Sequence, residues 1–399
     1  MKRSLFALAA LSALAGAAQA QSSVTVSGVI DESYKAVTQT TGTGLHSVAQ
    51  GLKDSQWTSN RLIIKGEEDL GGGLKSVFFI ESGMALMSAD AGQSGLGATT
   101  ANNTTAPWQN LRQTYVGLKD SKFGEFRMGY QYTPEYFQRI TNIGGSANVI
   151  GTAGTAASAV LQVIGLRTID QYNAATWTSP AFYNTTLSLG LGTSNAMTDA
   201  GFAAAATTSN TSIAGGVDPS KDSKSSGLAK TVALAWEKGP AKATLSNTQL
   251  TANNYTITNY QVATNGVTTT AATNTTQANT TLSASYDFGM VKLVSFGAIR
   301  NTTNVITPAS NYKTTVKSVG ALVPVTPRIT LGANYGMEDS TKVGALSSKG
   351  RTYQASVQYA FSKRTSAYAI YARASDSTVT ASTGLNNVTQ TGLGLMHTF

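Results

Sequence analysis

The sequence contains no cysteine, and only eight of its 399 residues are proline. A chain without cysteine cannot be a small secreted scaffold held by disulfides, so its stability depends on backbone hydrogen bonds and packing. Charged residues are also scarce, at 12% of the chain, and they give a formal net charge of +9. The basic residues form no Lys/Arg-rich run, so the composition does not indicate a nucleic-acid partner.

The first twenty residues have the three parts of a secretory signal peptide. Lys2 and Arg3 precede an apolar stretch, and small residues follow up to Ala20. This order predicts a cleaved signal peptide over residues 1–20 and an exported mature chain over residues 21–399. After the leader no run of eighteen apolar residues occurs, which argues against a transmembrane helix. The protein is therefore either soluble outside the cytoplasm or inserted in a membrane as a β-barrel.

Hydrophobic residues recur mainly with a period of two, which is typical of β-strands. In residues 353–361 the odd positions carry Tyr, Ala, Val, Tyr and Phe, whereas the even positions are small or polar. Residues 329–335 alternate in the same way. A soluble sandwich has the same periodicity, so alternation alone does not distinguish a dry core from a lipid-facing wall.

The lengths of the connections between strands favour a lipid-facing barrel over a soluble sandwich, because short turns and long segments alternate along the chain. Short turns are predicted at 69–73, 119–124, 182–185, 237–241, 286–290, 325–328 and 362–365. Long segments rich in Thr, Asn, Gly and Ala lie at 83–107, 132–170, 193–228, 251–279 and 374–389. Seven turns and eight long loops predict sixteen strands between Val24 and Phe399. This sorting is typical of an all-β, antiparallel transmembrane β-barrel, and sixteen strands leave room for an aqueous channel.

The chain ends on the aromatic residue Phe399, and the alternation suggests why. The odd positions of this segment are expected on the lipid-facing side and the even positions on the lumen side. Phe399 is then expected in the aromatic girdle at the periplasmic rim. The lipid-facing set is Leu393, Leu395, His397 and Phe399, and the lumen set is Gly392, Gly394, Met396 and Thr398.

Six stretches, spread over the mature chain, resemble a known family. They are SVTVSGVIDESY (23–34), RLIIKGEEDLGGGLKSVFFIES (61–82), RQTYVGLKDSKFGEFRMGYQYTPEY (112–136), TSPAF (178–182), YAFSKRTSAYAIY (359–371) and the terminal GLMHTF. The sequence resembles the trimeric general-diffusion porins of Gram-negative outer membranes, in particular the β-proteobacterial anion-selective type. The resemblance implies a homotrimer surrounded by outer-membrane lipid and lipopolysaccharide. It also implies a third long loop folded into the lumen, and a C-terminal Phe399 that the barrel-assembly machinery reads.

The residues also place several charged side chains inside the barrel. Arg61, Lys65 and Glu67 alternate with Leu62 and Ile64. A basic residue at the lipid-facing midplane costs roughly 2–4 kcal/mol, so the charged set is expected in the lumen. The same argument places Lys75 and Glu81 inside, opposite Phe78 and Ile80, and Arg112 inside, opposite Tyr115.

The resemblance assigns the constriction of the channel. Arg61, Arg112 and Arg167 match the basic cluster that the family sets on its wall, and Glu135 and Asp170 of the third long loop (about 132–170) match the acidic side. With Glu81, these residues form the predicted constriction, while Lys65, Glu67 and Lys75 are further lumen charges. A ring of guanidinium groups favours anions, and salt screens the effect. Alternatively, the same arginines form ladders with Glu67 and Glu81 that hold the wall and contribute little to selectivity.

No catalytic or metal-binding pattern competes with a channel. The two histidines, His46 and His397, lie in a predicted loop and at the terminus, and no His/Cys/Asp/Glu spacing suggests zinc. An enzyme and a cofactor are therefore not expected. The leading hypothesis is a water-filled outer-membrane channel for passive diffusion of ions and small hydrophilic solutes, with mild anion preference. The alternatives are a substrate-specific anion channel and a secreted β-rich adhesin, although a solenoid adhesin should repeat at a short fixed period.

Overall fold

The computed structural model describes residues 23–41, 44, 46–54, 56–84, 86, 111–134, 171–198, 228–252, 275–304, 311–342, 348–376 and 385–399. Among the predictions, the signal peptide, the third long loop from residue 135 onward and the constriction candidates Glu135, Arg167 and Asp170 lie outside these residues. Within them, no helix is long and apolar enough to span a membrane.

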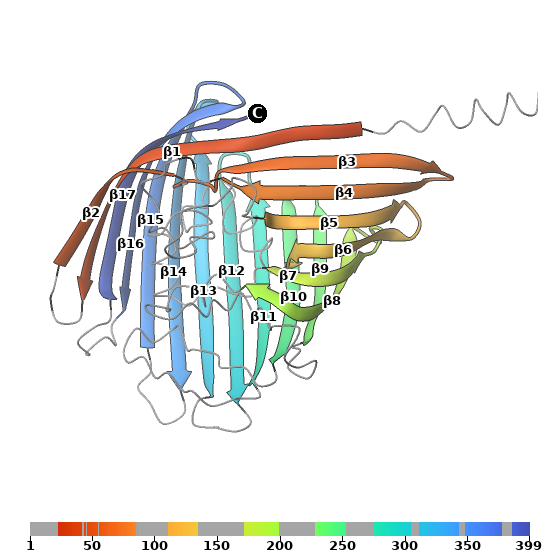
Figure 1. Cartoon of the computed structure of the whole chain (residues 1–399). Helices are drawn as coiled ribbons and strands as arrows, with labels where there is room; N and C mark the ends of the chain where they lie inside the picture. Colours follow the sequence, from red (N-terminus) through yellow and green to blue (C-terminus); the bar gives the residue numbers. More distant parts are fainter. Residues whose placement is uncertain are drawn as a thin grey trace, which may run out of the picture.

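The described residues form antiparallel β-strands that make up a single sheet (Figure 1). The strands are β1 (Ser23–Thr41), β2 (His46–Asp54), β3 (Arg61–Gly71), β4 (Leu74–Gly83), β5 (Leu111–Asp120), β6 (Gly124–Tyr132), β7 (Gln171–Thr178), β8 (Thr185–Thr198), β9 (Leu228–Lys238), β10 (Ala241–Ala252), β11 (Thr275–Asp287), β12 (Lys292–Asn304), β13 (Tyr312–Pro324), β14 (Ile329–Lys342), β15 (Ser348–Ala360), β16 (Thr365–Asp376) and β17 (Leu385–Thr398).

The sheet closes into a barrel because β1 pairs along both of its edges. On one edge, residues 29–41 pair with β17. On the other edge, residues 23–29 pair with β3 and residues 32–40 pair with β2. Strands β2 and β3 therefore pair with successive parts of the same edge of β1 and together count as one of the sixteen positions. Residues 55–60 separate the two strands. The predicted barrel of sixteen antiparallel positions is confirmed.

The short turns lie where the alternation of loop lengths predicts them. They join β3 to β4, β5 to β6, β7 to β8, β9 to β10, β11 to β12, β13 to β14 and β15 to β16. The first of these turns needs glycine, because Gly71, Gly72 and Gly73 all have positive φ angles. One expectation was wrong: His46 does not lie in a loop but begins β2, because the pairing of β1 with β2 continues up to Thr40 and His46.

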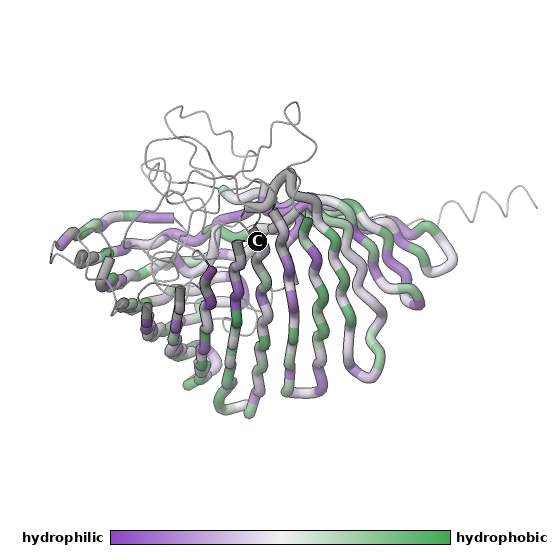
Figure 2. Tube along the Cα trace, turned by 90° about the horizontal axis from the view of Figure 1, so that it is seen from below, coloured by the Kyte–Doolittle hydropathy of each residue, from purple (hydrophilic) through white to green (hydrophobic). Residues whose placement is uncertain are grey.

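The two faces of the wall differ in chemistry, and hydropathy alternates along the strands (Figure 2). In β17, Leu393 and Leu395 are exposed on the outer face, whereas Met396 packs inside against a buried cluster that includes Tyr368. The predicted alternation of the C-terminal segment is confirmed. Exposed aromatic side chains gather at the short-turn rim, as expected for a girdle: Phe123, Phe182, Tyr183, Phe288, Phe361 and Phe399.

Candidate pore constriction

The inner wall formed by β3 to β6 carries the charged residues that the sequence places in the lumen. Arg61, Lys65 and Glu67 share the inner face of β3. Across the neighbouring strand, Lys75 Nζ forms an ion pair with Glu67. Both of these side chains are well exposed to water, so we expect the pair to contribute little to stability.

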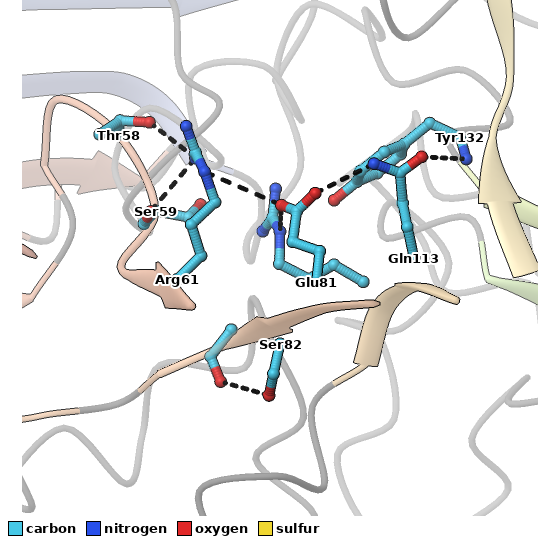
Figure 3. Close-up of polar contacts among 9 residues, drawn as sticks. Thr58, Ser59, Arg61, Glu81, Ser82, Gln113 and Tyr132 are labelled. Carbon is cyan, nitrogen blue, oxygen red and sulfur yellow. Dashed lines mark hydrogen bonds and ion pairs between the residues drawn. The ribbon is translucent and has the colours of Figure 1, made fainter. Parts of the chain in front are cut away.

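Glu81 of β4 lies between two arginines of this wall. Arg112 Nε donates a hydrogen bond to Glu81 Oε1 at 2.7 Å, and Arg61 Nε lies 3.9 Å from the same oxygen. Gln113 Nε2 donates to the second carboxylate oxygen at 3.0 Å. Arg61 and Gln113 approach Glu81 from opposite sides (Figure 3). The carboxylate is thus held on both oxygens, and the cluster keeps one positive charge in excess.

A β-bulge allows two consecutive residues of β5 to face the lumen. Glu81 is opposite Gln113 and Ser82 is opposite Leu111, so Arg112 is the extra residue on β5. A bulge adds one residue to one strand and re-aims the side chains beside it. Arg112 and Gln113 are therefore both buried on the inner face, and the assignment of Arg112 to the constriction stays a prediction.

The bulge also corrects the expected position of Tyr115. The Tyr115 ring stacks on Phe79 with a centroid distance of 5.3 Å, and the Arg127 guanidinium lies 4.7 Å from its centroid. Val116, the next residue, is exposed on the outer face. The expectation that Tyr115 lies opposite Arg112 was wrong, because simple alternation along β5 does not account for the inserted residue.

The two arginines beside Glu81 differ in their access to water. The Arg112 side chain is only 4% exposed, and its guanidinium also lies 5.5 Å from the Tyr132 ring. The Arg61 side chain is 25% exposed. This geometry fits the wall-ladder interpretation for Arg112 and the constriction interpretation for Arg61.

Arg61 is oriented by the chain between β2 and β3. Its Nη1 donates to Thr58 Oγ1 at 3.0 Å and to the Ser59 carbonyl at 3.2 Å. The Thr58 amide in turn donates to Asp31 Oδ2 at 2.7 Å. Because Asp31 belongs to β1, the first strand helps to position the arginine across the break.

Asp31 is the centre of a buried network that sequence reasoning did not anticipate. The Trp57 amide donates to Oδ2 at 2.6 Å, and the Tyr368 hydroxyl donates to Oδ1. The Asp31 amide donates to Asn60 Oδ1 at 2.5 Å. This network joins β1, the 56–60 segment and β16, and only the three-dimensional pairing of distant strands brings these residues together.

Arg127 and Glu125 of β6 are further lumen charges that the sequence analysis missed. Arg127 Nε donates to Glu125 Oε1 at 2.7 Å, with side-chain exposures of 34% and 20%. The signal was present in the sequence, because these residues alternate with Phe126 and Met128, which are exposed on the outer face. The wall therefore carries a second basic group beside the Arg61 cluster.

Comparison with known proteins gives a consistent assignment. A family model described as Gram-negative porin matches residues 7–379. The outer membrane porin protein 32 of Delftia acidovorans is 35% identical over 34% of this chain, and the match spans 33% of that relative's length. An outer membrane porin protein of Bordetella pertussis is 25% identical over 92% of this chain and 93% of its own.

Solved structures share the barrel fold at low sequence identity. An anion-selective porin from Comamonas acidovorans superposes with a TM-score of 0.67 at 21% identity, over 95% of this chain and 100% of that one. An outer membrane protein of Vibrio cholerae, solved in a trimer form, gives a TM-score of 0.61 at 13% identity, over 95% of this chain and 99% of its own.

Proposed function

The chain belongs to the Gram-negative porin family, and we propose that it forms a water-filled channel with a mild preference for anions. Ions and small hydrophilic solutes would diffuse passively through it across the outer membrane. Family membership makes the protein an outer-membrane channel and not an enzyme. The observation that carries the anion preference is the partly exposed Arg61 guanidinium, held beside a Glu81 carboxylate that Arg112 already neutralises.

The proposed anion preference follows from the balance of charge on the inner wall. With the Glu81 carboxylate bound by Arg112 and Gln113, Arg61 presents positive charge to the lumen. Arg127 adds a second guanidinium on the same wall, but Glu125 balances its charge, so the excess of positive charge lies on Arg61. An anion about 4 Å from a fixed positive charge in water gains about 1 kcal/mol, and more where the channel is narrow and less polarisable. The similar fold of an anion-selective porin also supports a preference for anions over cations.

The other side of the constriction is proposed from the family resemblance. Glu135 and Asp170 would provide acidic groups from the third long loop, and Arg167 a further basic group near the wall. These residues lie outside the described part of the chain. Phe399 is proposed as the signal for the barrel-assembly machinery, and lipopolysaccharide as a neighbour in the outer leaflet.

We also propose a homotrimer whose contacts include the outer face of β1 and β2. Glu32 is opposite Leu395, which is 54% exposed outside, and opposite Asp54 of β2. Asn60 Nδ2 donates to both carboxylates, at 2.9 and 3.2 Å. Two carboxylates on an outer wall are costly against lipid and are better tolerated under a neighbouring protein. The trimer form of the Vibrio cholerae protein is consistent with this arrangement.

The test of function is the zero-current potential of the purified protein in a planar bilayer under a potassium chloride gradient. We expect the sign for chloride permeation in the wild type and a smaller or reversed potential in Arg61→Glu. A wild-type potential with the sign for potassium would mean that acidic residues dominate the constriction. The absence of conductance steps in correctly folded protein would overturn the channel itself.

A further inference from the structure

The outer face of β13 to β16 carries a group of basic side chains toward the rim opposite the short turns. We call Lys317, Lys349, Arg351 and Arg373 the basic patch. Strand alternation puts all four outside the barrel. Lys317 shares its face with the exposed Val319, Lys349 and Arg351 with the exposed Tyr353, and Arg373 with the exposed Tyr371, whereas the intervening residues Ser318, Thr352 and Ala372 are buried inside.

The strand register brings the patch together from three strands, β13, β15 and β16. Lys317 is opposite Met337, and Met337 is opposite Arg351, so the first two basic residues lie two strands apart in one row. Neighbouring strands lie about 4.8 Å apart, which separates their backbones by about 10 Å. Arg373 is opposite Tyr353, which is two residues from Arg351 on the same face of β15. Long basic side chains at these positions can reach one ligand.

The patch has more positive charge than its own acidic neighbour can neutralise. Asp339 is opposite Lys349, and its Oδ1 lies 3.4 Å from Arg351 Nη1. Arg351 Nη1 also donates to the Gly350 carbonyl at 2.7 Å. Arg373 Nε is buried and has no hydrogen-bond partner among the described residues. One carboxylate thus faces four basic side chains.

The adjoining strands β9 to β12 lack this charge at the same height. On the described outward positions of β9 to β12, in the half away from the short turns, Lys230 is the only charged residue. Its neighbours there are Asn, Gln, Thr and apolar side chains, such as Gln249, Thr280 and Asn301. The basic patch is therefore a local feature of β13 to β16 and not a general property of the rim.

The height of the patch matches the edge of the bilayer. Tyr335 and Tyr353, which are paired and exposed, lie just below it, while Phe361 lies at the short-turn rim. The eight residue steps from Tyr353 to Phe361 span about 27 Å along the strand, or about 20 Å across the membrane at the usual strand tilt. That is close to the apolar band of about 25 Å that barrels present to lipid. The basic patch then lies at the level of the outer-leaflet headgroups.

We propose that the basic patch binds the phosphorylated saccharide headgroup of an outer-leaflet glycolipid, that is, lipopolysaccharide. The ligand must be anionic to match the charge, and it must be anchored in the membrane to reach an outward-facing wall. Arginine forms paired hydrogen bonds with phosphate, and two of the four residues are arginines. The inference rests on the proposed function only for the placement of the barrel in the outer membrane.

The test measures binding of fluorescently labelled lipopolysaccharide without O-antigen to the full chain refolded in detergent, at low and high salt. Arg351→Glu combined with Arg373→Glu should weaken binding roughly 25-fold or more, because each basic residue near a membrane surface contributes about a fivefold factor. The matched control is Lys230→Glu, which makes the same charge change on β9 and should bind as the wild type does. Arg351→Gln combined with Arg373→Gln should give an intermediate loss if the double Glu variant folds poorly.

A variant that binds lipopolysaccharide more tightly would show that the basic patch recognises the lipid and does not only stabilise the barrel. Asp339→Asn removes the carboxylate that competes for Arg351, so binding should tighten a few-fold. Enzymatically dephosphorylated lipopolysaccharide should bind the wild type as weakly as the intact lipid binds the double Glu variant, and millimolar inorganic phosphate should not displace the lipid. Equal affinity of wild type and the double Glu variant, or displacement by free phosphate, would overturn the proposal.

Two further readouts distinguish other outcomes. If the double Glu variant changes the oligomeric state and not lipid affinity, the patch is a subunit contact and the lipid assignment is wrong. Single-channel conductance of the same variants should equal that of the wild type. A failure to conduct in all variants and in the wild type would count against the proposed channel while leaving the binding result intact.

Discussion

Phe399 exchanges two backbone hydrogen bonds with Gly28, from the Gly28 amide to the Phe399 carbonyl at 3.0 Å and from the Phe399 amide to the Gly28 carbonyl at 3.1 Å. The last residue thus closes the barrel against its first strand, and the C-terminus lies beside β1 in Figure 1. The Phe399 ring lies over Gly28, where a Cβ atom would collide with the ring. Glycine at this position therefore makes room for the terminal aromatic side chain.

This contact predicts different effects of Phe399→Ala in the test tube and in the cell. Phe399 is 42% exposed, so the loss of its ring should lower the free energy of unfolding of the refolded barrel by only about 1 kcal/mol. If Phe399 is also the assembly signal, the amount of folded barrel in the outer membrane should fall much further. The measurements are urea unfolding in detergent and the heat-shifted fraction on gels of outer membranes. A proportional loss in both would contradict a role in assembly.

Gly28→Leu should displace the Phe399 ring while leaving the terminal residue in place. We expect a loss of about 1–3 kcal/mol in the free energy of unfolding, because overpacking forces the ring or the strand to move. The combination with Phe399→Ala should recover part of this loss, since the collision partner is gone. The measurement is urea unfolding of the two single variants and the double variant. Additive losses would show that the ring and Gly28 do not interact.

Arg61→Glu should lower the ratio of chloride to potassium permeability several-fold, because it reverses a partly exposed charge in the lumen. Arg61→Lys keeps the charge and should keep most of the preference, although it loses the contacts to Thr58 and Ser59. The difference between the variants should shrink at high salt, where screening shortens the reach of each charge. Zero-current potentials at two salt concentrations provide the measurement. An unchanged ratio in Arg61→Glu would remove this residue from the constriction.

Arg112→Ala should affect stability more than selectivity. The change leaves Glu81 buried without its 2.7 Å partner, and breaking a buried ion pair by removing one member typically costs about 3–5 kcal/mol. Glu81→Leu combined with Arg112→Leu removes both charges and should be closer to the wild type in stability. Urea unfolding of both variants measures the difference. A large selectivity change in folded Arg112→Ala would instead assign this arginine to the constriction.

Tyr368→Phe should weaken the network that holds the 56–60 segment to β1. The variant removes the hydroxyl donor to Asp31 Oδ1, so we expect a loss of about 1–3 kcal/mol in the free energy of unfolding, measured in urea. Because Asp31 also binds the Thr58 amide, the orientation of Arg61 should loosen and current noise at the open level should rise. Tyr371→Phe, on the outer face of the same strand, is the matched control and should change neither quantity.

Much of this protein is determined by local patterns in the sequence. The period-two alternation, the seven short turns and the terminal Leu393–Phe399 segment predicted the barrel, its sixteen positions and the faces of β17. The lumen positions of Arg61, Glu67, Lys75 and Glu81 followed from the same alternation. These features are local because adjacent side chains on a strand point to opposite faces. Glu135, Arg167 and Asp170 stay predictions, since they rest on resemblance and lie outside the described residues.

The tertiary structure decided what depends on pairing between strands. The bulge at Arg112 exists only relative to Glu81 and Ser82 across the ladder, and it turned Tyr115 inward. The break between β2 and β3 is visible only because both strands pair with β1, which lets Asp31 reach Thr58. The basic patch joins residues of β13, β15 and β16 that the sequence separates. Register between strands is set by the summed fit of many cross-strand contacts, so no single stretch of the chain encodes it.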